Sequence, residues 1–273
     1  MATLLKPIPF YLICNMGTFL SDIPNQYPNH LILWQLYEAD YRYRAKVKWL
    51  QERGYKIIMD NGAYEGAQMD FDRYMLACMQ ARPSVIVLPD FPNSPLTDTR
   101  TVSIAFMLKA EQVLAHSKHW RPKFMYCPHG DSQISVLDHF DWTYKYMDSA
   151  KVIVGIGLQY KLWEDEKQTR EAARVKMLEA IWHNSDTEMS AREFEHHILG
   201  ARWEPTLAFY DMTSTQSIIG LDSAKPMSCA IGGANYPESP KSKAELMSED
   251  VADEEKLWDQ VNRFCRAYGL IVK

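Results

Sequence analysis

The sequence predicts an α/β protein that folds as a single (β/α)8 barrel of the TIM type. Short apolar runs rich in Val and Ile alternate with longer segments of helical periodicity, which is the pattern of parallel strands joined by crossover helices. Eight such runs are present, and 273 residues suit one barrel domain over residues 1–273. Three aspartates, Asp60, Asp90 and Asp222, directly follow or close three of the runs. We therefore expect these acids at the carboxyl ends of the strands.

The expected strands and helices alternate along the whole chain. The strands are predicted at 10–15, 30–35, 56–60, 85–88, 123–127, 151–156, 197–199 and 217–221. The helices between them are predicted at 36–53, 70–82, 97–117, 132–147, 165–183, 190–195 and 204–212, with a last packing helix at 251–268. Eight strands predict a closed barrel.

Several residues mark the expected ends of these elements. Gly54 follows the first long helix, and Pro83 ends the second. Ser190 and Glu193 have the spacing of a capping box, which predicts a helix start. The segment 235–243 is rich in Pro, Ser and Lys without apolar periodicity, so we expect a loop or lid there.

Composition excludes several classes of protein. The apolar fraction is 47% and the charged fraction 24%, and no apolar run approaches the roughly 20 residues of a membrane-spanning helix. The first ten residues lack the features of a signal peptide, so we expect a soluble, cytoplasmic protein. Five scattered cysteines without a Cys-x-x-Cys pair argue against a disulfide framework or a zinc site. Neither a metal nor another cofactor is expected.

The net charge of −5 argues against indiscriminate nucleic-acid binding, because phosphate contacts come from Lys and Arg. Two segments nevertheless place aromatic side chains among cations, at 41–48 and 118–123. A solvated helix face explains the spacing of such segments better than a phosphate-binding site does. Their candidate contacts to a nucleic-acid backbone are Arg42, Arg44, Lys46, Lys48, Arg121 and Lys123.

Carboxylates grouped at a barrel mouth suit glycosidic-bond chemistry. One carboxylate attacks the anomeric carbon, and another handles the proton of the leaving group. The same group could bind a divalent metal, but His129 is the one histidine expected at a strand end, and His196 and His197 are expected at the start of a strand. Metal hydrolysis is therefore the weaker interpretation.

Six short motifs in order resemble the tRNA-guanine transglycosylase superfamily. Asp60-Asn61-Gly62-Ala63-Tyr64 is similar to the Asp-Ser-Gly-Gly-aromatic signature of that family, and Asp90 matches the acid that closes its fourth strand. Gly155-Ile156-Gly157-Leu158 resembles its Gly-Gly-Leu element, and Ile198-Leu199-Gly200 its Leu-Met-Gly element. Pro128-His129-Gly130-Asp131 stands where the family has a Gln-Gly-Gly turn, and Asp222 matches its nucleophile. The resemblance runs from about residue 10 to 230.

Two features of the tRNA enzymes are missing. The sequence lacks their Cys-x-Cys-x-x-Cys zinc subdomain, which helps to position tRNA, and has Ser223-Ala224-Lys225-Pro226 in place of Leu-Pro-Thr-Arg. This compact form looks more like the DpdA-type 7-deazaguanine DNA transglycosylases of bacterial genomic islands and phages. The small size suits a phage-encoded version acting in the host cytoplasm.

The resemblance implies a role for each matching residue. Asp222 would attack C1′ of a deoxyguanosine flipped out of DNA, and Asp60 would act as general acid and base while a 7-deazaguanine such as preQ0 replaces guanine. Asp90 would bind the N1–H and 2-amino group of the base. The remaining implied base contacts are Tyr64 by stacking, Asn61, Gly62, His129, and the backbone around Gly130 and Gly157. Arg202 and Lys225 would join the other cations in holding phosphates.

Other functions remain open at this point. A tRNA transglycosylase shares all of this chemistry, and a nucleoside or glycoside hydrolase would resolve the intermediate with water. A catalytically inert barrel that binds nucleic acid or a protein is a third alternative, in which Asp222 would be a structural acid paired with Lys225. The sequence leaves open the oligomeric state and whether a helper protein supplies the DNA-binding surface.

Overall fold

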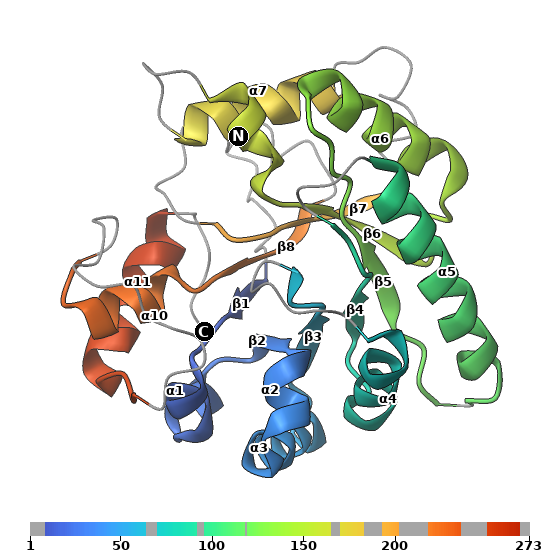
Figure 1. The fold of residues 1–273 in the computed structure, drawn as a ribbon. Coiled ribbons are helices and arrows are strands. Elements are labelled where there is room, and N and C mark those ends of the chain that lie inside the picture. Colours follow the sequence, from blue (N-terminus) through green and yellow to red (C-terminus); the bar gives the residue numbers. More distant parts are fainter. Residues whose placement is uncertain are drawn as a thin grey trace, which may run out of the picture.

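The computed structural model is a closed barrel of eight parallel strands surrounded by helices, which confirms the predicted fold class (Figure 1). It describes residues 9–63, 70–91, 96–117, 119–164, 170–182, 193–201, 218–235 and 250–267. The strands follow one another around the barrel in chain order, and β8 closes it by pairing with β1. No helix within these ranges is long and apolar enough to cross a membrane.

All eight strands lie where the apolar runs predict them. They are β1 (Phe10–Leu12), β2 (Asn29–Leu33), β3 (Lys56–Asp60), β4 (Val85–Val87), β5 (Lys123–Tyr126), β6 (Val152–Ile156), β7 (Glu195–Ile198) and β8 (Ile218–Ser223). The bounds of the last two strands differ from those predicted. The strand β7 begins two residues before His197, and β8 contains Asp222 instead of ending before it.

The helices form the outer ring, with short elements at several strand ends (Figure 1). They are α1 (Met16–Leu20), η1 (Ile23–Gln26), α2 (Trp34–Ala39), α3 (Tyr41–Glu52), α4 (Phe71–Ala81), α5 (Leu96–Ala115), α6 (Gln133–Tyr146), η3 (Leu158–Trp163), α7 (Arg170–Trp182), α10 (Lys225–Gly232) and α11 (Glu254–Ala267). The elements α1, η1, η3 and α10 were not expected from the sequence.

Two helix predictions need correction. The helix expected over 36–53 is two helices, because Asp40 is extended and its carboxylate accepts hydrogen bonds from the backbone N–H groups of Arg42 and Tyr43, which starts α3 afresh. The helix expected over 190–195 is wrong at its described end, where Glu193 and Phe194 form a turn and Glu195 begins β7. Residues 190–192, the helix expected over 204–212 and most of the loop expected over 235–243 lie outside the described residues.

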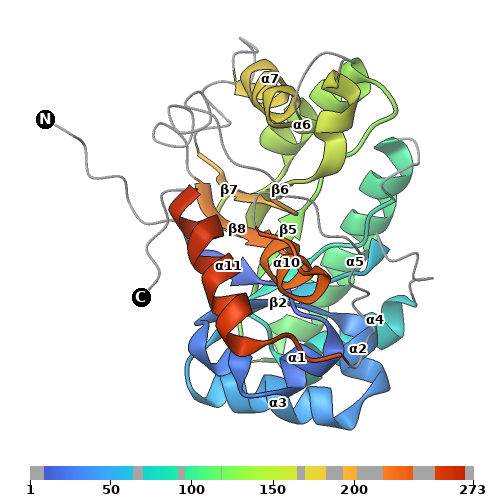
Figure 2. The ribbon, with the colours of Figure 1, turned by 90° about the vertical axis from the view of Figure 1, so that its left-hand side faces the viewer.

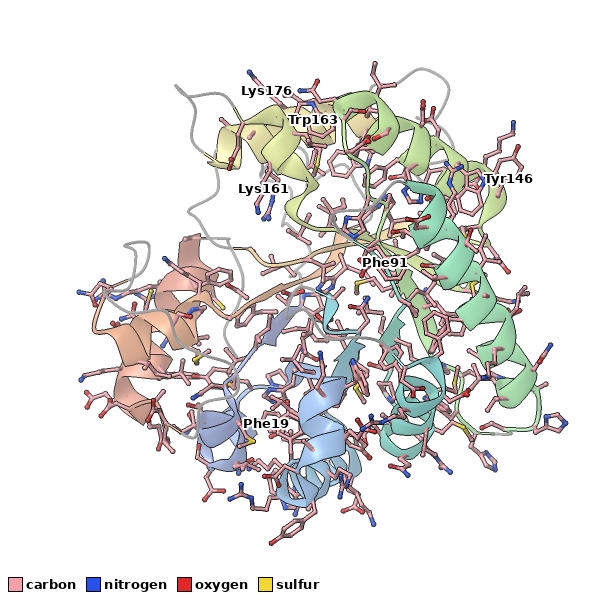
Figure 3. The ribbon with its side chains drawn as sticks, in the orientation of Figure 1. Phe19, Phe91, Tyr146, Lys161, Trp163 and Lys176 are labelled. Atoms are coloured by element: carbon pink, nitrogen blue, oxygen red, sulfur yellow. The ribbon has the colours of Figure 1, made fainter. Side chains whose placement is uncertain are left out.

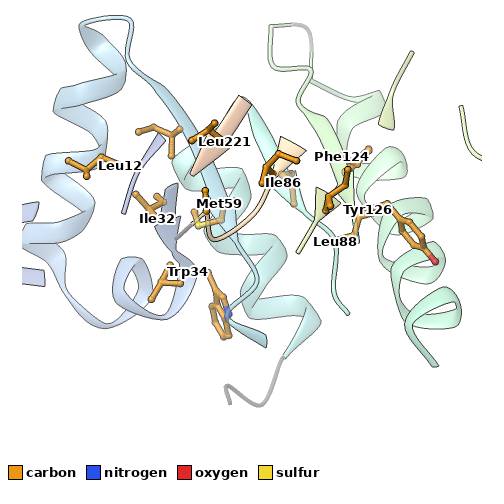
Figure 4. Packing of buried hydrophobic residues seen from close by; sticks show 14 of the residues in the cluster. Leu12, Ile32, Trp34, Met59, Ile86, Leu88, Phe124, Tyr126 and Leu221 are labelled. Carbon is orange, nitrogen blue, oxygen red and sulfur yellow. The ribbon is translucent and has the colours of Figure 1, made fainter. Parts of the chain in front are cut away.

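Alternation along the strands separates two apolar cores. The inner core fills the barrel with side chains such as Tyr11, Leu31, Ile58 and Met125. The outer core lies between the strands and the helices, and Figure 4 shows Ile32, Met59 and Ile86 of it. Because successive side chains of a strand point to opposite faces, a residue two positions from an inner-core residue also faces into the barrel.

The C-terminal helix is strongly amphipathic, as predicted. It buries Leu257, Val261 and Phe264 and lies beside α10 (Figure 2). The rings of Phe264 and Phe10 have centroids 5.0 Å apart, so α11 covers the start of β1.

Candidate active site

Three carboxylates come together at the carboxyl end of the barrel. Asp60 ends β3 two residues after the inner-core residue Ile58, and Asp222 of β8 pairs in register with the inner-core residue Tyr11, so both belong to the inner face. Asp90 lies three residues past the end of β4 and is 7% exposed. The pKa of the Cys127 thiol is raised well above its usual range, first by burial and then by the negative charges of Asp90, Asp60 and Asp222. The three carboxylates therefore lie within electrostatic range of one buried thiol of the barrel interior.

The carboxylate of Asp222 is held at both oxygens. Its Oδ2 lies 2.8 Å from Nε2 of His197, and its Oδ1 accepts a hydrogen bond of 2.8 Å from the backbone N–H of Gly200. Gly200 has a φ of 61°, a conformation that glycine adopts without strain. The two contacts fix the orientation of the carboxylate, and each oxygen keeps a second lone pair for a reacting atom.

Asp90 is held in a similar way by two side chains from neighbouring strand ends. Its Oδ2 lies 2.5 Å from Nε2 of His129, and its Oδ1 accepts a hydrogen bond of 2.9 Å from the side-chain amide of Asn61. The same amide donates to the carbonyl of Leu88 at 2.6 Å. The structure thus brings together three residues that the resemblance assigns to base binding.

The loop after β3 is shaped by its own polar side chains. Asp60 accepts a hydrogen bond from the backbone N–H of Gly62, and Asn61 accepts one from the N–H of Ala63, both at 2.8 Å. The indole of Trp34 donates to the carbonyl of Asn61 at 2.8 Å. Gly62 has a φ of 70°, and a Cβ there would collide with the side-chain amide of Gln35. This loop aims Asn61 at Asp90.

His129 is anchored through its backbone by a second histidine. Nδ1 of His139 lies 3.0 Å from the backbone nitrogen and 2.7 Å from the backbone oxygen of His129, while Nε2 of His139 contacts the hydroxyl of Tyr126. Burial lowers the pKa of His139 to about 4, so this imidazole is neutral near pH 7. A connected set of polar groups therefore extends from Asn61 through Asp90 and His129 to α6.

The two remaining glycines predicted for the site lie at turns after β5 and β6. A Cβ on Gly130 would approach the backbone nitrogen of Val136 to 2.7 Å, so only glycine lets this turn pack on the start of α6. Gly157 directly precedes η3, with a φ of −103° and a ψ of −133°. Both are at the carboxyl end of the barrel, as expected.

The predicted backbone cations are not gathered at this end. Arg121 and Lys123 lie at the amino end of β5, opposite the carboxylates; Lys123 pairs with Glu195 at 2.5 Å, and Arg121 donates to the carbonyl of Leu114 at 2.5 Å. This placement argues against their assignment to phosphates that flank a base in this site. In a parallel barrel the first residue of a strand is at the far end from the strand's carboxyl terminus.

The cations of α3 lie in the outer ring of helices. Arg42 pairs with Asp40 at 2.6 Å, Arg44 donates to the carbonyl of Glu38 at 2.6 Å, and Lys46 donates to the carbonyl of Ser21 at 2.7 Å. Lys48 is 3.9 Å from Glu52 on its own helix. These contacts fit the solvated helix face better than a phosphate site beside Asp222.

Of the other expected contacts, Lys225 is placed at the carboxyl end and two residues lie outside the described ranges. Lys225 begins α10, two residues after the end of β8 at Ser223. Tyr64 and Arg202 are the two that the structure does not describe. Phe91, directly after Asp90, was not expected; it is 41% exposed and lies within the ring of helices (Figure 3).

Sequence reasoning missed His197 and His139. His197 was expected at the start of a strand, but it is the third residue of β7 and faces inward, as its register pairing with Gly155 shows. The alternation Glu195, His197, Leu199 was a signal for this placement. His139 lies inside a helix and gave no such signal. Among the described residues, no three His, Cys, Asp or Glu side chains form a group that could hold a metal ion.

The fold and the site define a (β/α)8 barrel with three carboxylates at its carboxyl end. No family model matches the sequence, and no curated protein matches it. Among solved structures, fructose-bisphosphate aldolase from Campylobacter jejuni is similar, with a TM-score of 0.54, 10% identity, and coverage of 98% of this chain and 91% of the aldolase. Active domain 2 of a chitinase from Pyrococcus furiosus has a TM-score of 0.47 and 11% identity, with coverage of 98% and 99%. At these identities the aldolase likeness shows the barrel fold alone.

Proposed function

We propose that the protein exchanges guanine in DNA for a 7-deazaguanine through a covalent glycosyl-aspartate intermediate. The observation that carries this proposal is the convergence of Asp60, Asp90 and Asp222 at one end of the barrel. Base exchange needs three roles that a carboxyl group can fill: a nucleophile, a proton carrier, and an acceptor for the N1–H and 2-amino group of the base. The site offers a carboxylate for each.

In the first half of the reaction, an oxygen of Asp222 forms a bond to C1′ while the C1′–N9 bond breaks. The bonding electrons leave with guanine, and Asp60 supplies the proton that makes the departing base neutral. The hydrogen bonds from His197 and Gly200 hold the attacking carboxylate in place.

In the second half, the N9–H of the incoming 7-deazaguanine gives its proton to Asp60. N9 then attacks C1′, the C1′–oxygen bond breaks, and Asp222 returns to a free carboxylate. Asp60 ends protonated, as it began, so the exchange consumes no external acid or oxidant.

Base recognition is assigned to Asp90, Asn61 and His129. Asp90 keeps lone pairs beyond those used by Asn61 and His129, and it can accept from the two donors on the guanine edge. Phe91 and Tyr64 supply candidate aromatic faces for the base, which loses its stacking when it leaves the duplex at a cost of a few kcal/mol. DNA is favoured over tRNA because the sequence lacks the Cys-x-Cys-x-x-Cys element that helps to position tRNA in the resembling family.

The test is mass spectrometry of nucleosides digested from duplex DNA, and in parallel from tRNA, after incubation with the protein and preQ0. We expect a deaza-deoxyguanosine in DNA with the intact protein and none with Asp222→Asn, which keeps the size of the side chain. A modified nucleoside in tRNA alone would favour the tRNA enzyme, an abasic site would favour a hydrolase, and no change in either nucleic acid would contradict the proposal.

A further inference from the structure

The contact between His197 and Asp222 is the most enclosed acid–imidazole pair in the described part of the molecule. Both side chains are 2% exposed, and Nε2 lies 2.8 Å from Oδ2. Two polar side chains buried this deeply lose their hydration, which is costly unless the contact between them compensates. A barrel interior lined by Tyr11, Ile153 and Leu199 could be filled by an apolar residue at position 197.

The barrel is built to leave room for this imidazole. A Cβ on Gly220 would lie 2.7 Å from Nδ1 of His197 and 3.1 Å from Cε2 of Tyr11. The ring of Tyr11 meets that of His197 edge to face, with centroids 5.4 Å apart. Gly220 and Asp222 are two residues apart on β8, so the strand that carries the acid also provides the space for its partner.

We infer that His197 is a positioning residue that holds Asp222 for attack and stabilises it as a leaving group. This inference rests on the proposed function. When the C1′–oxygen bond of the intermediate breaks, its electron pair returns to the carboxylate, and the N–H groups of His197 and Gly200 receive the charge there. A hydrogen bond to an anion is stronger than one to the ester oxygen, so the donor favours breakdown of the intermediate.

This role predicts an unequal effect on the two halves of the reaction. Without the imidazole, the carboxylate is a poorer leaving group, so the second half slows more than the first. The covalent protein–DNA adduct should therefore accumulate while turnover falls. A purely structural role for His197 would instead lower adduct and turnover together, in proportion to the folded protein.

The experiment compares His197→Phe, which removes the donor but keeps a ring, with His197→Gln, whose amide N–H can replace Nε2–H. His196→Gln is the matched control, because His196 is the neighbouring buried histidine on β7 and instead contacts the hydroxyl of Tyr144 at 2.9 Å. Turnover is measured by nucleoside mass spectrometry with preQ0, adduct by denaturing electrophoresis with labelled DNA, and folding by thermal unfolding.

We expect His197→Phe to lower turnover about 10- to 100-fold and to raise the adduct fraction, and His197→Gln to recover most of the loss. If His197→Phe does not fold, Gly220→Ala provides the second test, since its methyl group must displace the imidazole without removing any donor. Normal turnover in whichever of these two variants folds, or a proportional loss of adduct and turnover in it, would overturn this inference and leave the proposed function standing. A wild-type protein that forms neither adduct nor product would overturn the proposed function, and this inference with it.

Discussion

At the amino end of the barrel, Glu195 faces Lys123, and these two side chains are 37% and 36% exposed. At the carboxyl end, Asp90 and Asp222 are nearly fully buried and are held by imidazoles, an amide and a backbone N–H. A lysine neutralises the first acid, whereas the hydrogen bonds orient the other two and leave lone pairs for a substrate. The difference shows which end of the barrel is prepared for chemistry.

The largest expected effect is a difference in exchange activity between variants of two inward-facing acids that lie at opposite ends of the barrel. Asp222→Asn should abolish adduct formation and lower exchange by about 10⁴-fold or more, because an amide is not a nucleophile for C1′. Glu195→Gln should leave exchange unchanged. Both variants are assayed on the same duplex DNA with preQ0, and equal losses in the two would remove the distinction between the ends.

Asp90→Asn should have a smaller effect, confined to recognition of the base. The amide keeps the size of the side chain but presents a donor where the guanine edge also presents donors, so we expect kcat/KM for preQ0 to fall about 10- to 100-fold. Steady-state kinetics at varied preQ0 measure it. An unchanged kcat/KM would move base recognition away from Asp90, His129 and Asn61.

A third prediction concerns the pH dependence of stability. Buried histidines contribute to it in a direction that follows from their lowered pKa values. Burial lowers the pKa of His30 and of His139 to about 4, and that of His196 to about 3. Their folded pKa values lie below the unfolded value of about 6.5, so the unfolded chain binds more protons in between. The stability that each neutral histidine contributes is fully present above about pH 6.5 and is lost as the pH falls toward the folded pKa.

The loss should amount to about 2 kcal/mol at pH 5 for each of these histidines. His30→Gln keeps a donor for the carbonyl of Pro24, which lies 3.1 Å from Nε2 of His30, but cannot take up a proton. Denaturant unfolding at pH 7.5 and pH 5 should show that this variant loses less stability than the wild type. Identical losses would contradict the burial argument.

The smallest effect is expected from single lysines, and it again compares the two ends. Lys225→Met should weaken DNA binding several-fold and reduce the salt dependence by about one ion, because Lys225 begins α10 at the carboxyl end. Lys123→Met should leave DNA affinity unchanged and cost at most about 1 kcal/mol of stability, since its ion pair is more than a third exposed. Binding isotherms of both variants and the wild type at several salt concentrations measure these affinities, and equal losses in the two variants would contradict the difference between the ends.

The strands were predictable because each apolar run is a local signal that burial in a parallel barrel requires. The acids at the strand ends followed from the same signal. The break at Asp40 was missed because helical periodicity continues on both sides of it, and only the extended backbone of Asp40 reveals the cap. The helix expected over 190–195 failed at its described end because the strand pairing of Glu195 with β6 overrides a local preference for helix.

By itself, the sequence determined the barrel, the order of its strands and the placement of Asp60, Asp90 and Asp222 at their ends. Only the tertiary structure decided that His197 holds Asp222, that Asn61 and His129 hold Asp90, and that Lys123 lies at the far end of the barrel. The physical reason is the range of the interactions. Strand formation depends on neighbours in sequence, whereas Asp222 and His197 are 25 residues apart and Asp90 and His129 are 39 apart, and these pairs meet only when the barrel closes.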